Sequence, residues 1–484
     1  MMMIIVVLLY FALLFGISRW TGRRATNRTF YRADRQSPWY LVAIGMVGAS
    51  ISGITFVSVP GMVNGIGMTY LQTCMGFIVG YVVIALVLLP LYYRLNLTTI
   101  YGYLGQRIGP RAYKTGASFF LLSKMTGAAV RFYVVCWILM ECGLATANGG
   151  NSLSPACYEW LFAVVVISMT ALIWLYTRQG GIKTLVWTDV LQTICLFGAL
   201  LLIIYKVMGE LGFSVTDAAI AIQKSELSRV FVMDDWVSKQ FFWKQFLSGA
   251  FIAIVMTGLD QDMMQKNLTC RSLRDAQKDM CTYGVAFLPA NLLFLSLGVL
   301  LTFWYQQHGM PLPAKGDELL PTFVLSSLAT TDGQLLAVVF LIGMVAAAFS
   351  SADSALTALT TSYCVDICRR ADDEHLRRRV HAAMAVIFVL FILLFRVLNS
   401  TSVIDAIYIL CSYTYGPLLG LFAFGLLTKR AANDRVVPYV CVASPLLCYV
   451  LDVAIGQLTG YRFGYELLML NGLLTFCGLW FSKR

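Results

Sequence analysis

The chain has 484 residues, of which 59% are hydrophobic and 13% are charged, with a formal net charge of +11. Soluble domains are about 45–50% apolar and about 25% charged, so this composition excludes an ordinary soluble protein and indicates a surface that faces mostly lipid. The positive charge does not indicate a nucleic-acid partner. Lys and Arg form short clusters between apolar runs, which is typical of the loops of a membrane protein rather than of a phosphate-binding face.

Thirteen apolar runs are long enough to cross a bilayer, which requires about 20 predominantly apolar residues. The first run could be taken for a signal peptide. It lacks a preceding basic segment and a small-residue cleavage site, so we interpret it as a leader transmembrane helix. The predicted helices cover residues 2–18, 38–60, 68–93, 115–141, 158–177, 184–207, 240–263, 281–305, 334–364, 380–398, 403–427, 437–456 and 465–481.

The basic residues alternate along the connections between these helices. The segment after the first helix is rich in Arg, and every second connection after it is basic, whereas those near 61–67, 143–156 and 399–402 contain no Lys or Arg. Basic connections remain in the cytoplasm. We therefore expect a multi-pass protein of the plasma or bacterial inner membrane, with its N-terminus outside and its C-terminus inside.

The helix at 38–60 contains small and hydroxylated residues where Leu or Val would be expected in mid-membrane. The run is Gly48-Ala49-Ser50-Ile51-Ser52-Gly53. Such a run can unwind and direct backbone carbonyls at an ion, provided that it lines a cavity. It can also serve close packing between helices. The sequence leaves both interpretations open.

The helix at 334–364 carries a hydroxyl-rich face. Ala347, Ser350, Ser351 and Ser354 fall on one side of it at helical spacing, and Asp353 lies on the flank. Hydroxyl, carbonyl and carboxylate oxygens suit a hard cation such as sodium. The alternative is a packing face whose hydroxyls bond to carbonyls four residues earlier. Burying Asp353 in a membrane helix costs at least about 2.5 kcal/mol without a partner, which favours the functional interpretation.

Three further charged residues within the predicted membrane helices are candidates for a functional role. Asp189 could bind a cation or pair with the nearby Lys183. Lys124 and Arg131 share one helix face, and each requires a carboxylate, carbonyl oxygens or an anionic substrate. Glu141 is a candidate structural partner for Arg131, while Lys124 could instead extend toward the inner membrane surface.

Enzyme chemistry is not indicated. The sequence has no metal-ligand spacing, nucleophile elbow or phosphate loop, and its three histidines fall in loops or at helix ends. We therefore expect no catalytic activity and no organic cofactor; a membrane sensor or an integral membrane enzyme is the less favoured class. The thirteen cysteines contain no CxxC pair. Cys142 and Cys157 flank a predicted external loop, where a disulfide could form in an oxidising compartment.

These segments together resemble the sodium:solute symporter family, which includes sodium–glucose, proline, pantothenate and sialic acid transporters. The resemblance extends over nearly the whole chain, and the order and spacing of its motifs make it specific. The motifs are GASISGITF at 48–56 with SVP at 58–60, GGIK at 180–183 with WTDVLQ at 187–192, DQ at 260–261 with QK at 265–266, and AAFSSADS at 347–354 with DI at 366–367.

The resemblance implies an all-α membrane protein with a leucine-transporter-like core and about thirteen transmembrane helices. Two inverted five-helix repeats would occupy 38–208 and 240–430, each beginning with a broken helix, and the external loop 209–239 would separate them. A leader helix and basic loop at 1–37 would precede the core, and two helices at 431–484 would follow it. The family also leads us to expect a functional monomer.

The resemblance further implies a central sodium site. The matching ligands are the backbone carbonyls of Gly48, Ile51 and Ala347 and the hydroxyls of Ser350 and Ser351. Some members that resemble the sialic acid transporters hold a second sodium ion. The corresponding candidate second cation site consists of Asp189, Ser350, Asp353 and Ser354. Because Asp353 replaces a serine, it could strengthen that site or carry a proton instead.

The resemblance places the solute between the two broken helices and their neighbours. The matching positions in this chain are Ser52, Thr55, Tyr70, Cys74 and Gly127. The family's sialic acid members bind the solute carboxylate with an Arg at the position of Gly127, and here Arg131 follows one helical turn later. We therefore expect Arg131 to pair with an anionic group of the solute.

These expectations combine into one functional hypothesis. The chain is predicted to take up a small organic solute, such as a sugar acid or another carboxylate, together with sodium by alternating access. The alternative within transport is a proton-coupled symporter that uses Asp353 and Asp189 as a relay.

Overall fold

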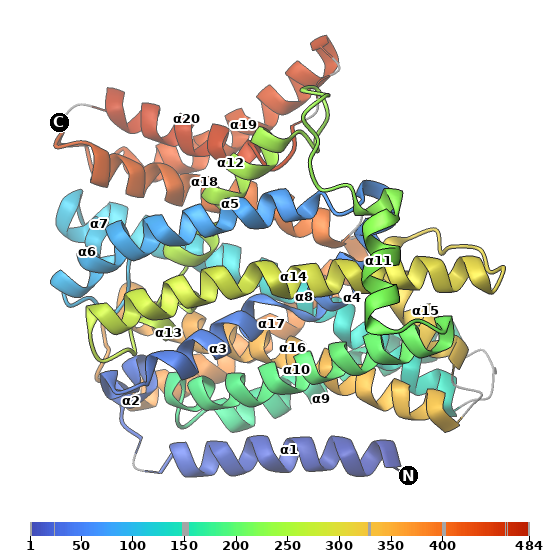
Figure 1. Cartoon of the computed structure of the whole chain (residues 1–484). Helices are drawn as coiled ribbons and strands as arrows, with labels where there is room; N and C mark the ends of the chain where they lie inside the picture. Colours follow the sequence, from blue (N-terminus) through green and yellow to red (C-terminus); the bar gives the residue numbers. More distant parts are fainter. Residues whose placement is uncertain are drawn as a thin grey trace.

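The computed structural model describes residues 2–23, 25–147, 154–327, 331–398, 403–459, 461 and 463–482. Within these residues the chain is helical and forms no β-strand, and the extended residues Ser37 and Cys270 make only an isolated bridge. Most of the long helices run side by side with nearly parallel axes (Figure 1). A helix is the expected form for apolar runs of this length, because it satisfies its own backbone hydrogen bonds where lipid offers none.

The helices follow one another in chain order with short connections. In the first half they are α1 (Met2–Thr21), α2 (Asn27–Arg32), α3 (Trp39–Ser50), α4 (Gly53–Ile66), α5 (Tyr70–Val83), α6 (Leu89–Arg94), α7 (Gly102–Arg107), α8 (Pro110–Ala147), α9 (Pro155–Thr177), α10 (Ile182–Leu211) and α11 (Val215–Lys224). In the second half they are α12 (Phe242–Ala253), α13 (Gln261–Asn267), α14 (Leu273–Gln307), α15 (Leu319–Ser326), α16 (Thr331–Ser362), α17 (Glu374–Leu398), α18 (Val403–Leu427), α19 (Val437–Thr459) and α20 (Leu467–Phe481).

Short segments of tighter or wider helix complete the backbone. Among the fully described segments, single turns of 3₁₀-helix lie in connections at η1 (Ala33–Arg35), η3 (Glu226–Ser228) and η5 (Gly316–Glu318). Three π-helical turns extend longer helices, at η2 (Ile84–Leu88), η4 (Ile254–Gly258) and η7 (Tyr363–Ile367). Such π-helical turns occur frequently at functional sites.

Each of the thirteen predicted apolar ranges lies on a helix or on two consecutive helices. Eight helices are long and apolar enough to cross a membrane alone, and two bent pairs bring the number to ten. The remaining candidates, α1, α18 and α20, are shorter in their described parts. The all-helical, membrane-spanning architecture is therefore confirmed, while the number thirteen, the inverted repeat and the domain limits remain predictions. The side chain of Cys142 and the connections 148–153 and 399–402 lie outside the described residues.

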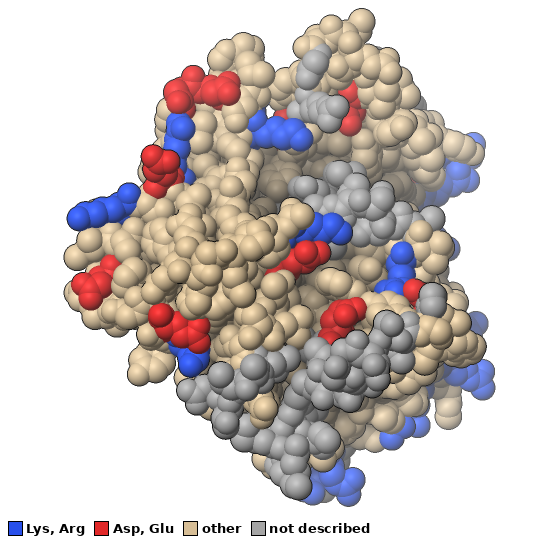
Figure 2. Space-filling model, turned by 90° about the vertical axis from the view of Figure 1, so that its right-hand side faces the viewer, with Lys and Arg blue, Asp and Glu red and all other residues tan. Residues whose placement is uncertain are grey.

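The two ends of the bundle differ in the connections that they carry. Short helices formed by the basic connections, namely α2, α6, α7 and α13, gather at the left-hand end in Figure 1, whereas α11 and α15 lie at the right-hand end. The chain termini also lie at opposite ends (Figure 1). On the described part of the right-hand face, charged side chains of both signs are scattered among uncharged residues (Figure 2).

Two of the membrane helices are broken. The axes of α3 and α4 differ by 59°, and those of α12 with η4 and α13 differ by 70°. At the first break Ile51 adopts φ −83° and ψ 85°, and Ser52 is extended, so the helical hydrogen-bond pattern is interrupted there. At the second break the Asp260 side chain caps α13 by accepting a hydrogen bond from the backbone N–H of Asp262. The breaks expected in the helices at 38–60 and 240–263 are present.

The helix that carries the hydroxyl-rich face is the most deeply buried candidate span. In α16, 83% of the apolar window is buried inside the protein, more than in any other of the eight long spans. It packs against α3, α8, α10 and α17. This position places the oxygen-bearing residues of α16 beside the first helix break rather than against lipid.

Candidate ion and solute site

The break between α3 and α4 leaves backbone oxygens without their helical partners. The Ile51 N–H donates to the Val47 carbonyl at 3.1 Å, but the Ser52 N–H donates to the Ser50 carbonyl at 3.1 Å instead of to Gly48. In the part of the chain that the structure describes, no group donates to the carbonyl oxygen of Gly48 or of Ile51. Buried carbonyls normally have a donor. These two oxygens are therefore available to a cation.

The hydroxyl-rich face of α16 meets this break directly. The Ser351 hydroxyl donates to the carbonyl oxygen of Ala49 at 3.2 Å and to that of Ala347, one turn earlier in α16, at 3.3 Å. The first of these bonds joins two segments that are 302 residues apart in sequence. The structure therefore brings together the predicted ligands Gly48, Ile51, Ala347 and Ser351 from α3 and α16.

The fifth predicted ligand of the central site faces a different partner. The Ser350 hydroxyl donates to Asp189 Oδ1 at 2.7 Å. Asp189 lies on α10, and its Oδ2 is 2.7 Å from Lys266 Nζ; both side chains are at most 2% exposed. Lys266 follows the predicted helix at 240–263, in one of the basic connections, and its side chain is buried because α13 turns it into the protein. Lys183, the alternative partner of Asp189, lies 4.0 Å from Asp34 instead.

The rest of the candidate second cation site lies next to this ion pair. Asp353 accepts hydrogen bonds from the Tyr176 hydroxyl and from the Ser354 hydroxyl, the latter at 3.3 Å. All of these side chains are buried. The structure places Ser350 against Asp189 and Ser354 against Asp353, with Lys266 paired to Asp189, and the role of these residues as a cation site remains a prediction.

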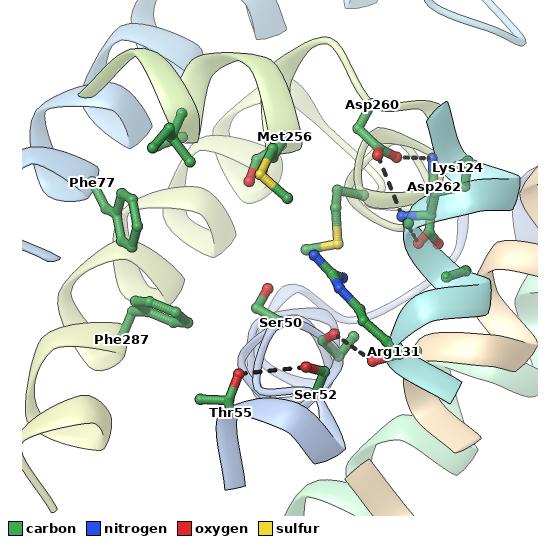
Figure 3. Close-up of a pocket in the computed structure, with 18 of the residues that line it drawn as sticks. Ser50, Ser52, Thr55, Phe77, Lys124, Arg131, Met256, Asp260, Asp262 and Phe287 are labelled. Atoms are coloured by element: carbon green, nitrogen blue, oxygen red, sulfur yellow. Dashed lines mark hydrogen bonds and ion pairs between the residues drawn. The ribbon is translucent and has the colours of Figure 1, made fainter. Parts of the chain in front are cut away.

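A cavity that is partly lined by Ser351 lies between the two broken helices and α5, α8, α14 and α18 (Figure 3). Of the six predicted solute-contacting residues, five line it, and the sixth, Cys74, is buried within α5 and does not. The Ser52 and Thr55 hydroxyls lie 3.4 Å apart on its wall. The five predicted residues that line the cavity are Ser52, Thr55, Tyr70, Gly127 and Arg131.

One side of the cavity is charged. Lys124 Nζ lies 2.6 Å from Asp262 Oδ2 and 3.3 Å from Asp260 Oδ2, and the Tyr415 hydroxyl also donates to Asp260. Of the partners that the sequence left open for Lys124, the structure provides carboxylates. These groups connect α8, α13 and α18 at the second helix break. Neither carboxylate was predicted as a site residue, although Asp260 belongs to the DQ motif. Two acids at the end of an apolar run are a usable signal, because ionisable residues in membrane helices are usually functional.

Arg131 extends from α8 toward the middle of the cavity (Figure 3). Its guanidinium group forms no ion pair or hydrogen bond with any described residue. The candidate partner Glu141 accepts a hydrogen bond from the Tyr158 hydroxyl instead. A half-buried guanidinium with five donors and no acceptor is suited to binding an anion that enters the cavity.

The opposite side of the cavity is aromatic and apolar. The rings of Phe77 and Phe287 lie 5.6 Å apart, and Met256 also lines the cavity (Figure 3). Next to this wall the Tyr283 hydroxyl lies 2.6 Å from the Ser50 hydroxyl and 2.8 Å from that of Tyr81. The cavity therefore offers a charged side, a hydroxyl-lined side and an apolar side to one small molecule. Sequence periodicity gave no indication of this aromatic wall.

The chain is similar to known sodium-coupled transporters along most of its length. The sodium/sialic acid symporter of Aliivibrio fischeri is 24% identical over 88% of this chain and 83% of its own length. The sodium/sialic acid symporter of Proteus mirabilis is 25% identical over 87% of this chain and 83% of its own length. Among solved structures, the substrate-bound, outward-open state of a Na⁺-coupled sialic acid symporter superposes with a TM-score of 0.80, covering 99% of this chain and 97% of that one at 19% identity.

The structural match establishes a common fold. The sodium:solute symporter family matches residues 30–435, a region that contains both helix breaks, the hydroxyl-rich face of α16 and the cavity. The resemblance predicted from the motifs is therefore confirmed: the chain belongs to the sodium:solute symporter family.

Proposed function

We propose that this protein is a sodium-coupled symporter that takes up a small organic solute bearing a carboxylate. The observation that carries the proposal is the juxtaposition of the unbonded Gly48 and Ile51 carbonyls with the Ser351 hydroxyl of α16. Membership of the family supports sodium as the coupling ion. The protein would act as a monomer in a bacterial inner or plasma membrane, with the basic ends of its helices in the cytoplasm.

Sodium fits the oxygens that meet at the first break. It is a hard cation, and carbonyl and hydroxyl oxygens replace its hydration shell without requiring a formal charge. The proposed ligands are the carbonyls of Gly48, Ile51 and Ala347 and the hydroxyls of Ser351 and Ser350. Ser350 would join the ion by rotating its hydroxyl away from Asp189.

The proposed sodium site and the cavity share a wall, and this gives a physical route for coupling. Ala49, Ser50, Ser52 and Ser351 line the cavity; Ala49 and Ser50 end α3, and Ser52 lies in the break between α3 and α4. An ion that binds the carbonyls of this segment would fix its conformation against α16. The cavity wall would then be ordered before the solute binds. The solute affinity would therefore be higher in the presence of sodium.

The charge of the solute is inferred from Arg131. A guanidinium in a partly buried cavity forms charge-assisted hydrogen bonds with a carboxylate, and those bonds are stronger than neutral ones. Two relatives are sodium/sialic acid symporters by name, so a sialic acid is the first carboxylate to test. The apolar wall at Phe77 and Phe287 would contact the less polar part of such a molecule.

Uptake into proteoliposomes tests the proposal. We expect labelled N-acetylneuraminic acid, or another carboxylate identified by a thermal-shift screen, to accumulate with an inward sodium gradient and not with choline at the same pH. Accumulation in choline that follows an imposed pH gradient would contradict sodium coupling and favour the proton-coupled alternative through Asp353 and Asp189. Accumulation that responds to neither gradient would contradict symport altogether.

A further inference from the structure

The C-terminal helix α20 packs along α18 and reaches its backbone through one buried side chain (Figure 1). We propose that Asn471 of α20 is a positioning residue, which replaces a hydrogen bond that Pro417 withholds from α18 and thereby holds Tyr415 in the solute cavity. The inference rests on the proposed function, because it concerns the cavity that would bind the solute. α20 lies outside residues 30–435, so the family match does not cover this contact.

Pro417 interrupts the hydrogen-bond ladder of α18. It lies inside the helix. A proline has no backbone N–H, and its ring displaces the carbonyl of the residue four positions earlier, which is Tyr413. Such an oxygen needs another donor, because lipid offers none. The amide nitrogen of Asn471 donates to the Tyr413 carbonyl at 3.1 Å and to the Ser412 carbonyl at 2.9 Å. A side chain of α20 therefore supplies the donor that α18 lacks.

The orientation of this amide is fixed by its surroundings. Asn471 is fully buried, and its side-chain oxygen accepts a hydrogen bond from the Ser444 hydroxyl of α19. The Thr475 hydroxyl donates in turn to Ser444 at 2.8 Å. The amide nitrogen is therefore directed at the two carbonyl oxygens, which can only accept. Gly416 leaves room for this approach, since a Cβ atom there would lie 2.3 Å from the amide nitrogen.

The same turn of α18 reaches the solute cavity on its other side. The Tyr415 hydroxyl donates to Asp260 at the second helix break, and the Thr414 hydroxyl lies 2.6 Å from that of Ser123 on α8. Tyr415, Asp260 and Ser123 all line the cavity. The two residues before Thr414 are bonded to α20 through their carbonyls. One turn of α18 therefore connects α20 to the cavity wall.

A polar contact between membrane helices can also act only as a link between them. In that case the loss of Asn471 would lower the stability and leave the cavity unchanged. Positioning predicts a change at Tyr415 instead. It also predicts that this change depends on Pro417, because Pro417→Ala restores a backbone N–H for the Tyr413 carbonyl and makes the amide dispensable.

The test observes position 415 directly and requires no solute. 3-Fluorotyrosine replaces Tyr415 in the full chain, and its ¹⁹F resonance is recorded in detergent. We expect Asn471→Leu, which keeps a similar volume and removes the amide, to shift this resonance. Thr475→Val is the matched control, because it removes a hydroxyl of α20 that bonds to Ser444 rather than to α18. We expect the resonance to stay in place in that variant.

A double-mutant cycle and an uptake assay complete the test. In the Pro417→Ala background, we expect Asn471→Leu to leave the ¹⁹F resonance where Pro417→Ala alone puts it. In proteoliposomes, Asn471→Leu should raise the KM for labelled N-acetylneuraminic acid about fivefold, the effect of one lost hydrogen bond. The affinity for ²²Na⁺ should not change, because α18 carries no proposed ion ligand.

The inference is overturned if folded Asn471→Leu leaves the ¹⁹F resonance unchanged, or if Thr475→Val shifts it equally. It is also overturned if the shift is as large in the Pro417→Ala background. If Asn471→Leu does not fold, recovery of folded protein in the double variant supports the inference, and failure of the double variant to fold overturns it. Absence of sodium-dependent uptake by the unaltered chain would instead refute the proposed function and leave the ¹⁹F result standing.

Discussion

Lys124 Nζ lies 2.6 Å from Asp262 Oδ2, and this ion pair forms the charged side of the cavity into which Arg131 extends. The two cations behave differently, although they share one face of α8. Lys124 is satisfied by two carboxylates from the second helix break, whereas Arg131 contacts no acceptor among the described residues. The first is therefore a structural link between α8 and α13, and the second is available to a solute.

Lys124→Met should destabilise the protein. It would leave Asp260 and Asp262 buried without their shared cation, and breaking a buried ion pair in this way costs about 3–5 kcal/mol. The measurement is the midpoint of thermal unfolding in detergent. Lys183→Met is the matched control, because that ammonium is 41% exposed and 4.0 Å from Asp34, and such surface pairs contribute about 0–1 kcal/mol. Equal midpoints for the two variants would contradict a structural role for Lys124.

Arg131→Ala should weaken solute binding without unfolding the protein. Loss of charge-assisted hydrogen bonds of about 1.5–3 kcal/mol corresponds to roughly a ten- to hundredfold increase in KM for a carboxylate solute. Sodium binding should remain, because Arg131 is not a proposed ion ligand. Arg131→Lys should recover part of the affinity. An unchanged KM for the transported solute in Arg131→Ala would eliminate the assignment.

Ser351→Ala should weaken sodium binding. The hydroxyl contacts the Ala49 carbonyl beside the break, and removing one ligand or hydrogen bond of about 1 kcal/mol raises the sodium concentration for half-maximal uptake by roughly fivefold. Ser351→Thr keeps the hydroxyl and serves as the control. The prediction fails if Ser351→Ala shows the same sodium dependence as Ser351→Thr and the unaltered chain.

Gly76→Ala should disturb the contact between α5 and α12. A Cβ atom at Gly76 would lie 2.0 Å from the carbonyl oxygen of Phe246, and neither backbone can move without shifting its helix. Overpacking of this kind costs about 1–3 kcal/mol. Gly65→Ala on α4 is the matched control, because an added Cβ there meets nothing within 4 Å. We expect a lower unfolding midpoint for the first variant only, and similar midpoints would show that the two helices separate easily.

Much of the architecture could be predicted because lipid imposes strict rules on a sequence. Apolar runs of sufficient length must form helices there, and the alternating basic connections place successive helix ends at opposite surfaces. The hydroxyl-rich face of α16 and the small residues around Ile51 could be identified from the sequence for a similar reason. Polar groups in mid-membrane are energetically costly, so those that occur there usually have a function. Family motifs then related the two segments to each other.

The pairing of the buried charges could not be predicted in the same way. Local sequence placed Lys266 in a basic connection and suggested Lys183 for Asp189 and Glu141 for Arg131. The structure instead joins Lys266 to Asp189 and Lys124 to Asp262, and it leaves Arg131 facing the cavity.

The sequence by itself determined that this is a helical membrane protein. It also determined which helices carry polar residues in mid-membrane and to which family the chain belongs. Hydrophobicity, charge distribution and motif order are properties of the linear chain. Only the tertiary structure decided which oxygen meets which cation. The bend of 70° before α13 turns Lys266 inward, and the direction of a side chain after such a bend depends on the packing of several helices at once.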